Sequence, residues 1–284
     1  MTTMLEPARE WIAGQIRARV IGDDAESTAA RIMAEPGPRW FPPDSVLRVV
    51  HSDASMFVGG LRALLLQSLH PLAMAGVAEH SDYRSDPWGR LQRTADFLAT
   101  TTFGPAALAE QAVARVATVH RRVVGTASDG RAYAANDPHL LLWVHIVETD
   151  SFLRAYQRYG PQHLDSDQAD AYVNDSALIA EKLGSETPPR TVAELRQALH
   201  LFRPELRSTA AARAAARFLV LEPPLPLAAR APYALLASAA ISLLPVWARL
   251  PLRLPYLPVS ETLVVRPAGE AITRLIRWSL QPRA

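Results

Sequence analysis

Apolar side chains recur at helical spacing along most of the chain. Between residues 55 and 221 they return about every three to four positions, whereas the alternating pattern typical of β-strands is almost absent. Glycine, proline and Asp/Asn clusters separate the apolar segments. These segments predict helices over residues 5–20, 54–69, 72–79, 88–101, 105–124, 138–158, 166–183, 191–201, 209–220, 229–244 and 259–279. We therefore predict an all-α fold, built as a multi-helix bundle.

Capping residues predict where two of these helices begin. Asp137 directly precedes Pro138, which is typical of a helix N-terminus because the carboxylate accepts a backbone amide and proline tolerates the first turn. Thr191 is followed three residues later by Glu194, which predicts a capping box. Residues 36–43, which read PGPRWFPP, instead predict an extended loop that leads into the helical core.

The pattern divides the chain into three parts. Residues 1–45 hold an N-terminal helix and the extended loop, and residues 46–222 form the helical core. Residues 223–284 form a C-terminal segment rich in proline and leucine, which we expect to pack on that core.

One stretch of the C-terminal segment is apolar enough to raise the question of a membrane. Residues 231–248 carry no charge, and this length is close to the minimum for a membrane span. Because Pro232 and Pro245 interrupt the stretch, we favour a buried core helix. A peripheral membrane contact and a true span are the alternatives.

Composition excludes several kinds of chemistry. The 284 residues are 49% hydrophobic, enough for a sizeable core, and include no cysteine. Disulfides, iron–sulfur clusters and thiolate-bound haem are therefore excluded. The sequence also lacks the glycine-rich phosphate loops of nucleotide-binding proteins and the G-x-S-x-G elbow of serine hydrolases.

The distribution of charge and the N-terminal sequence give expectations about binding partners and cellular location. The chain has 30 basic and 28 acidic residues, spread without a basic run, so we expect no nucleic-acid partner. Residues 1–19 are rich in charge and lack the apolar region of a secretory signal. We therefore expect a cytoplasmic protein, with membrane association through residues 231–248 left open.

Two histidines fall on predicted apolar helix faces. His120 follows Val113 and Val116 at helical spacing, where a satisfied core histidine is more common than a metal ligand. His145 precedes Glu148 by one turn, a pair that suits either a metal or a buried hydrogen bond. A di-iron carboxylate centre is a weaker alternative, because the bundle proteins that hold one use E-x-x-H motifs and this sequence has none.

Arg90, Arg93 and Thr94 form a third candidate group. Their spacing puts two guanidinium groups and a hydroxyl on one side of a helix. Such a group suits a carboxylate, a phosphate or a haem propionate, because guanidinium forks match planar oxyanions. A solvated charged helix face is the alternative.

An ordered series of motifs connects these candidates. In chain order the motifs are His70-Pro71, Gly76-Val77 with His80-Ser81, Asp86-Pro87, Arg90-Leu91-x-Arg93-Thr94, Phe103-Gly104, His120-x-x-Val123-x-Gly125, Tyr133-x-Ala135-x-Asp137-Pro138 and Trp143-Val144-His145. The series resembles the DUF2236 family, which includes the latex-clearing rubber oxygenases and the prenyl-cleaving oxygenase of the mycophenolic acid pathway. The resemblance extends over residues 46–184 and, more loosely, through the C-terminal segment.

The resemblance implies a globin-like helical core that holds haem b through a helix histidine. His120 matches that proximal iron ligand, and His145 and His80 are further candidates to bind the cofactor. The rubber oxygenases carry Arg-x-x-Lys-Thr on the distal side, where the lysine can cap the iron. This chain has Arg93 in place of the lysine, and a protonated arginine has no lone pair for iron. The resemblance thus assigns Arg90 and Thr94 to catalysis and Arg93 to a propionate or substrate anion.

These expectations combine into one functional hypothesis. The chain is expected to be a haem b-dependent oxygenase or peroxygenase-like oxidoreductase that uses dioxygen on an apolar small molecule, isoprenoid or phenolic in nature. The iron carries the redox step, and the protein supplies orientation and electrostatics. The alternative is a haem- or lipid-binding module without turnover.

Overall fold

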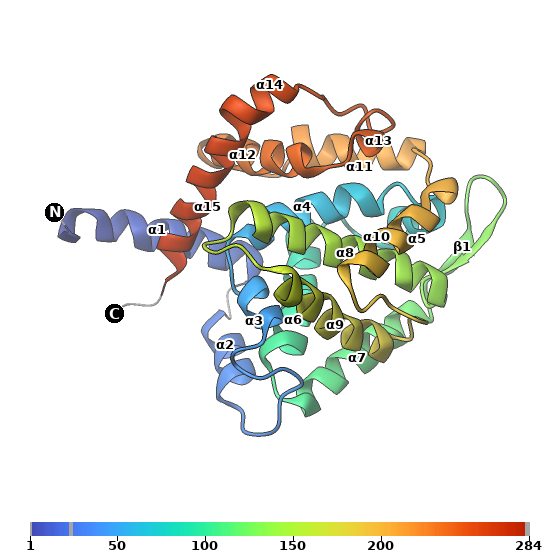
Figure 1. The fold of residues 1–284 in the computed structure, drawn as a ribbon, viewed down its shortest axis with the longest axis horizontal. Coiled ribbons are helices and arrows are strands. Elements are labelled where there is room, and N and C mark those ends of the chain that lie inside the picture. The colour runs from blue at the N-terminus through green and yellow to red at the C-terminus, as the bar shows by residue number, and fades with distance from the viewer. Residues whose placement is uncertain (1, 23–24, 282–284) are drawn as a thin grey trace.

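The computed structural model describes residues 2–22 and 25–281. It is mostly helical, which confirms the predicted all-α class (Figure 1). The elements are α1 (Thr2–Val20), α2 (Ala25–Ala34), α3 (Val46–His51), α4 (Ser55–Gln67), α5 (Pro71–His80), α6 (Pro87–Phe103), α7 (Ala106–His120), β1 (Val124–Thr126), β2 (Ala132–Ala134), α8 (Pro138–Tyr159), α9 (Ser166–Leu183), α10 (Val192–Leu201), the 3₁₀ turn η1 (Arg203–Glu205), α11 (Ala210–Leu221), α12 (Leu227–Leu243), α13 (Val246–Arg249), α14 (Pro258–Ser260), the π-helical turn η2 (Glu261–Val265) and α15 (Arg266–Leu280). The globin-like arrangement remains a prediction.

The predicted helix starts are largely confirmed. Asp137 caps α8 by accepting the His139 amide at 2.9 Å. The hydroxyl of Thr191 accepts the Glu194 amide at 3.2 Å, but the Glu194 carboxylate accepts from the amide of Arg190, so only half of the predicted capping box forms.

The sequence pattern missed the helices α2, α3 and α13, the turn η1 and a short hairpin. Strands β1 and β2 pair antiparallel, with Gly125 opposite Tyr133. A side chain at Gly125 would collide with the Tyr133 hydroxyl, which explains the glycine. Each strand has three residues, too few to display an alternating pattern.

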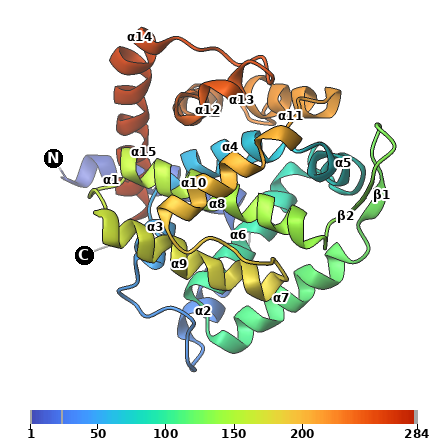
Figure 2. The same ribbon diagram turned by 45° about the vertical axis from the view of Figure 1, so that its right-hand side comes forward.

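Helices α4 and α8 form the central pair of the fold. Figures 1 and 2 both show α6, α7 and α9 on one side of this pair, and α11, α12 and α13 on the other. The two central helices approach closely because Gly59 lies against Phe152, where an added Cβ would be 2.7 Å from a ring carbon. Trp143 and Tyr156 of α8 are almost fully buried beside them.

Buried ion pairs connect the C-terminal segment to the core. Arg62 of α4 pairs with Asp150 at 2.7 Å and donates to the Leu243 carbonyl of α12 at 2.9 Å. Arg277 of α15 pairs with Asp53 at 2.6 Å. The largest apolar cluster includes residues from Phe41 to Leu254. The domain boundaries at residues 45/46 and 222/223 remain predictions.

The uncharged stretch 231–248 lies in α12 and α13, and much of one face is buried. Its buried residues include Ala239, Ala240 and Leu244. Among the described residues, no single helix is long and apolar enough to cross a membrane, while α4 and α5 pass that test only as a pair bent by 106°.

Candidate functional site

A buried polar group lies between the central helices. Gln67, the last residue of α4, donates its side-chain amide to a carboxylate oxygen of Glu148 on α8 at 3.1 Å. Burial raises the pKa of Glu148 to about 7, although the Gln67 hydrogen bond and the charge of Arg90 both act to lower it. The Glu148 carboxyl can therefore exchange a proton near neutral pH.

Arg90 brings a positive charge toward this carboxyl from α6. Asp86 starts the helix by capping the Gly89 amide at 2.9 Å, and Arg90 follows in the first turn. Burial lowers the pKa of the Arg90 guanidinium, while Glu148 favours its charged form. Because arginine starts from so high a pKa, the group stays protonated. The charge of Arg90 thus favours the ionised form of Glu148 from a distance, without a direct ion pair between the two described side chains.

His145 lies one turn before Glu148 on α8, as the spacing predicts. Its Nδ1 is 3.5 Å from the Thr149 hydroxyl, whereas its Nε2 is buried and has no hydrogen-bond partner among the described residues. Burial lowers the pKa of His145 to about 4, so the imidazole is neutral at pH 7.

A second buried histidine extends the polar interior. His51 of α3 contacts the Thr102 hydroxyl at 2.9 Å through Nδ1 and the Tyr172 hydroxyl at 3.3 Å through Nε2. Burial lowers the pKa of His51 to about 4 and raises that of Tyr172. Both nitrogens of His51 are occupied, so this residue suits a structural role.

His120 is the last residue of α7 and is half-buried. Its Nδ1 is buried without a hydrogen-bond partner among the described residues, and burial lowers its pKa. A neutral imidazole with a free nitrogen is the form that ligates a transition metal. The preceding apolar-face residue Val113 is buried, as the spacing predicts.

Three of these groups have chemistry that an iron porphyrin could use. His120 and His145 each have an unpartnered buried nitrogen, which is costly in a folded protein unless something uses it. The half-buried guanidinium of Arg90 can donate to an oxyanion. Among the described residues, no hydrogen bond or ion pair joins His120 to His145 or to Arg90, so each is a separate candidate donor.

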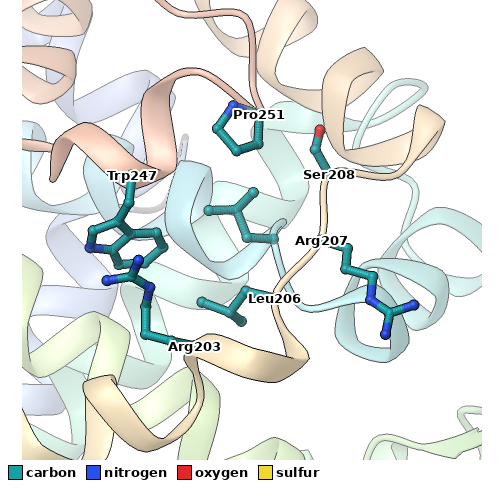
Figure 3. A pocket seen from close by; sticks show the side chains of 7 residues that line it. Arg203, Leu206, Arg207, Ser208, Trp247 and Pro251 are labelled. Carbon is teal, nitrogen blue, oxygen red and sulfur yellow. The ribbon is translucent and has the colours of Figure 1, made fainter.

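Two surface clefts lie elsewhere in the fold. The first, of about 140 Å³, is lined by Leu69, Arg203 and Trp247 among others, with the Arg203 guanidinium over the Trp247 ring (Figure 3). The second, of about 420 Å³, lies between α1 and the end of α15. Neither includes His120, His145 or Arg90.

Comparison with known proteins relates this geometry to a family. A family model described as "ER-bound oxygenase mpaB/B'/Rubber oxygenase, catalytic domain" matches residues 47–278, most of the chain. The chain belongs to this family. It is therefore an oxygenase catalytic domain. No curated protein and no solved structure matches it.

Within this oxygenase domain, the other two candidates on α6 do not join Arg90. Arg93 is exposed and pairs with Asp86 at 3.2 Å. The Thr94 hydroxyl is also exposed and donates to the Arg90 carbonyl at 3.0 Å. The predicted roles of Arg93 and Thr94 remain predictions.

His80 lies at the outer end of α5, where it is exposed. Its Nε2 is 3.1 Å from the Tyr133 hydroxyl, which donates to Glu79. The structure thus puts His80 beside the β-hairpin, and its cofactor-binding role stays a prediction.

Sequence reasoning on this oxygenase domain missed two contributors to the polar interior. Gln67 lies on α4, far in sequence from Glu148, and Tyr172 lies on α9. Neither belongs to a recognisable spacing pattern. It also missed a surface cluster of His70, His139 and Glu205, which come from three separate elements.

Proposed function

We propose that this oxygenase domain uses haem b, held by His120, to oxidise an apolar small molecule with dioxygen. The observation that carries the proposal is the buried, unpartnered Nδ1 of His120 in a chain of an oxygenase family. When bound, haem supplies the iron that activates oxygen species for attack on a carbon–carbon double bond or a C–H bond.

The side chains near Glu148 supply the electrostatics. Arg90 holds a fixed positive charge beside a carboxyl whose pKa is raised to about 7. Glu148 can therefore keep or release a proton at its carboxyl group, while Arg90 donates hydrogen bonds to dioxygen or a reaction intermediate. His145, neutral and unpartnered at Nε2, offers a second ligand or a hydrogen-bonding group for substrate.

Further roles on α6 extend this proposal. We assign Arg90 and Thr94 to hydrogen bonding of dioxygen or a reaction intermediate, and Arg93 to a propionate or a substrate anion. Thr94 would have to exchange the Arg90 carbonyl for dioxygen or the intermediate, and Arg93 would have to leave Asp86. Because Arg93 is an exposed pair partner, its release costs little.

The proposed substrate class is isoprenoid or phenolic. The family description names rubber oxygenases, which supports an alkene-bearing apolar substrate. Apolar residues of α4, α5 and α8, including Leu65, Met74 and Leu141, belong to the interior on which such a substrate would pack.

A peripheral membrane contact is also proposed, on a surface different from the expected stretch 231–248. We call residues 250–264 the apolar edge; its exposed side chains are Leu250, Tyr256, Leu257, Val259, Leu263 and Val264. Within residues 223–269, all of them described, the only carboxylate is Glu261, and it is buried against Arg249. Exposed Arg253 lies in the apolar edge, and no exposed carboxylate of residues 223–269 balances its charge, which suits an anionic lipid surface. Location in the cytoplasm stays a prediction.

Oxygen uptake tests the proposed activity. Purified protein reconstituted with haem is mixed with an isoprenoid alkene, and a saturated alkane of equal length is the control. We expect alkene-dependent oxygen consumption and oxygenated products. Turnover that requires hydrogen peroxide in place of dioxygen would assign a peroxygenase. Alkene binding without any turnover in either condition would contradict the proposal and favour a non-catalytic binding module.

A further inference from the structure

Three side chains from separate elements meet at the surface beside the ends of α5 and α8. His70 is the N-cap residue of α5, His139 is the second residue of α8, and Glu205 ends η1. The Nε2 of His70 is 3.3 Å from one oxygen of Glu205, and the Nε2 of His139 is 2.9 Å from the other. Ligand atoms from all three residues lie within 4.8 Å of one another.

Aromatic packing holds both imidazole rings in place. The His139 ring stacks on Phe202 with centroids 4.4 Å apart and planes 24° apart. His70 is almost fully buried and lies edge-on to Phe202 and tilted against Trp143. The geometry of the cluster is therefore built by the fold, and metal binding would not require the two rings to be gathered from solvent.

The residue types suit a cation. Imidazole nitrogens and carboxylate oxygens are the usual protein ligands of Zn²⁺ when no cysteine is present. Here the Nε2 atoms of His70 and His139 both face the carboxylate of Glu205, so the three potential ligand atoms converge.

We propose that His70, His139 and Glu205 bind Zn²⁺, a site independent of the proposed haem chemistry. Tetrahedral zinc with bonds of about 2.0–2.1 Å separates neighbouring ligand atoms by roughly 3.3 Å. Both imidazoles lie near the same carboxylate oxygen, Oε2 of Glu205: the Nε2 of His70 is already at this spacing, at 3.3 Å, and the Nε2 of His139 must widen only slightly from 3.0 Å. Because His139 is exposed, water can complete the coordination.

One hydrogen bond of His70 in the metal-free protein opposes zinc binding, and its loss on binding can be followed by spectroscopy. The Nδ1 of His70 accepts the Ala73 amide at 3.4 Å, so the ring proton of the metal-free protein is on Nε2. Zinc on Nε2 moves that proton to Nδ1, where it faces the Ala73 amide. The lost hydrogen bond is long and therefore weak. We expect micromolar affinity, weaker than that of a site without this conflict.

Bound zinc would attach the connection between α10 and α11 to the helical core. Glu205 belongs to η1, which links α10 to α11, whereas His70 and His139 begin core helices. Immediately after η1, the Arg207 amide donates to the Leu69 carbonyl at 2.8 Å, next to His70. Zinc would add a second attachment at this point and hold the connection against the core.

Calorimetric titration of the full-length protein with Zn²⁺ tests the proposal. We expect one equivalent bound, and at least about 100-fold weaker binding in His139→Ala and in Glu205→Gln, since each removes a ligand. His163→Ala, which removes an exposed histidine elsewhere, should bind zinc as the wild type does. Absence of binding by the wild type at 100 µM Zn²⁺, on the order of 100 times the expected Kd, would overturn the proposal. Equal binding by the two ligand variants would also overturn it, as would loss of binding in His120→Ala alone.

A nitrogen-15 correlation spectrum of the histidine rings provides a second readout that needs no variant to fold. We expect the His70 proton on Nε2 before zinc is added and on Nδ1 afterwards. A His70 signal that zinc leaves unchanged would contradict the site even if the metal binds elsewhere.

Discussion

Replacement of His120 by leucine separates a functional histidine from a structural one. The buried Nδ1 of His120 has no hydrogen-bond partner among the described residues, so the folded chain carries the desolvation cost of that atom. An unpaired buried polar group costs about 1–3 kcal/mol. Because the residue is half-buried, we take the lower end of that range. His120→Leu should therefore raise the free energy of unfolding of the haem-free protein by about 1 kcal/mol.

Chemical and thermal unfolding of haem-free protein measure this effect. A gain of about 1 kcal/mol corresponds to a rise in Tm of roughly 2–4 °C for a chain of this size. His200→Leu is the matched control, because His200 is exposed and lies near the C-terminal end of α10 as His120 does in α7. The control should stay within about 0.5 kcal/mol of the wild type. A loss of 1 kcal/mol or more in His120→Leu would refute the reasoning, because it would mean that the imidazole stabilises the fold itself.

Three further predictions concern the interior and the surface. Arg90→Ala and Thr94→Ala should each keep haem but lower turnover by about 10²–10³-fold, because each removes a positioned donor. Arg217→Ala, on the exposed face of α11, is the control and should leave turnover unchanged. Unchanged turnover in Arg90→Ala would contradict the role of Arg90. The pKa of Glu148 is raised to about 7 from 4.5, so its proton stabilises the folded state at low pH and the unfolding free energy should fall by up to about 3 kcal/mol as pH rises from 4.5 to 7. The pKa values of His51 and His145 are lowered to about 4 from 6.5, so these two residues have the opposite effect and stabilise the folded state as pH rises. Both are present in the wild type and in Glu148→Gln, so the difference between the two proteins isolates the effect of Glu148. Parallel pH profiles of the unfolding free energy would contradict the prediction. Vesicles containing anionic lipid should bind the wild type, and should bind the double variant Leu257→Ser/Leu263→Ser much more weakly. Equal binding of the variant and the wild type would contradict contact through the apolar edge, as would equal binding of the wild type to vesicles of neutral lipid only.

The helices could be predicted because their positions depend on local spacing. The recurrence of apolar residues located α8 to within one residue at its end, and Asp137 with Pro138 located its start. The β-hairpin could not be predicted in the same way, because its register depends on the Gly125–Tyr133 contact. Residue spacing is informative about helices and says little about strands of three residues.

The candidate site was predictable only where its residues share one helix. His145 and Glu148 lie one turn apart, so their common face follows from the sequence. Arg90 and Arg93 have a similar spacing, yet Arg90 shares the interior with Glu148 while Arg93 pairs with Asp86 at the surface. Which of two neighbouring guanidinium groups turns inward is decided by the packing of α6 against other helices.

Long-range clusters were beyond the sequence pattern. His70 and His139 are separated from Glu205 by 135 and 66 residues. Only the path of η1 across the ends of α5 and α8 brings these side chains together. No spacing within one element records such a meeting, so the structure is needed to find it.

Haem content is the most direct measure of the central claim that His120 holds the cofactor. The pyridine haemochromogen of freshly purified protein, expressed with haem supply, should show haem b at one per chain. His120→Ala should fold with the same circular dichroism and lose most of that haem, while His200→Ala should retain it. Wild-type protein without haem b, or full haem stoichiometry in His120→Ala, would contradict the account.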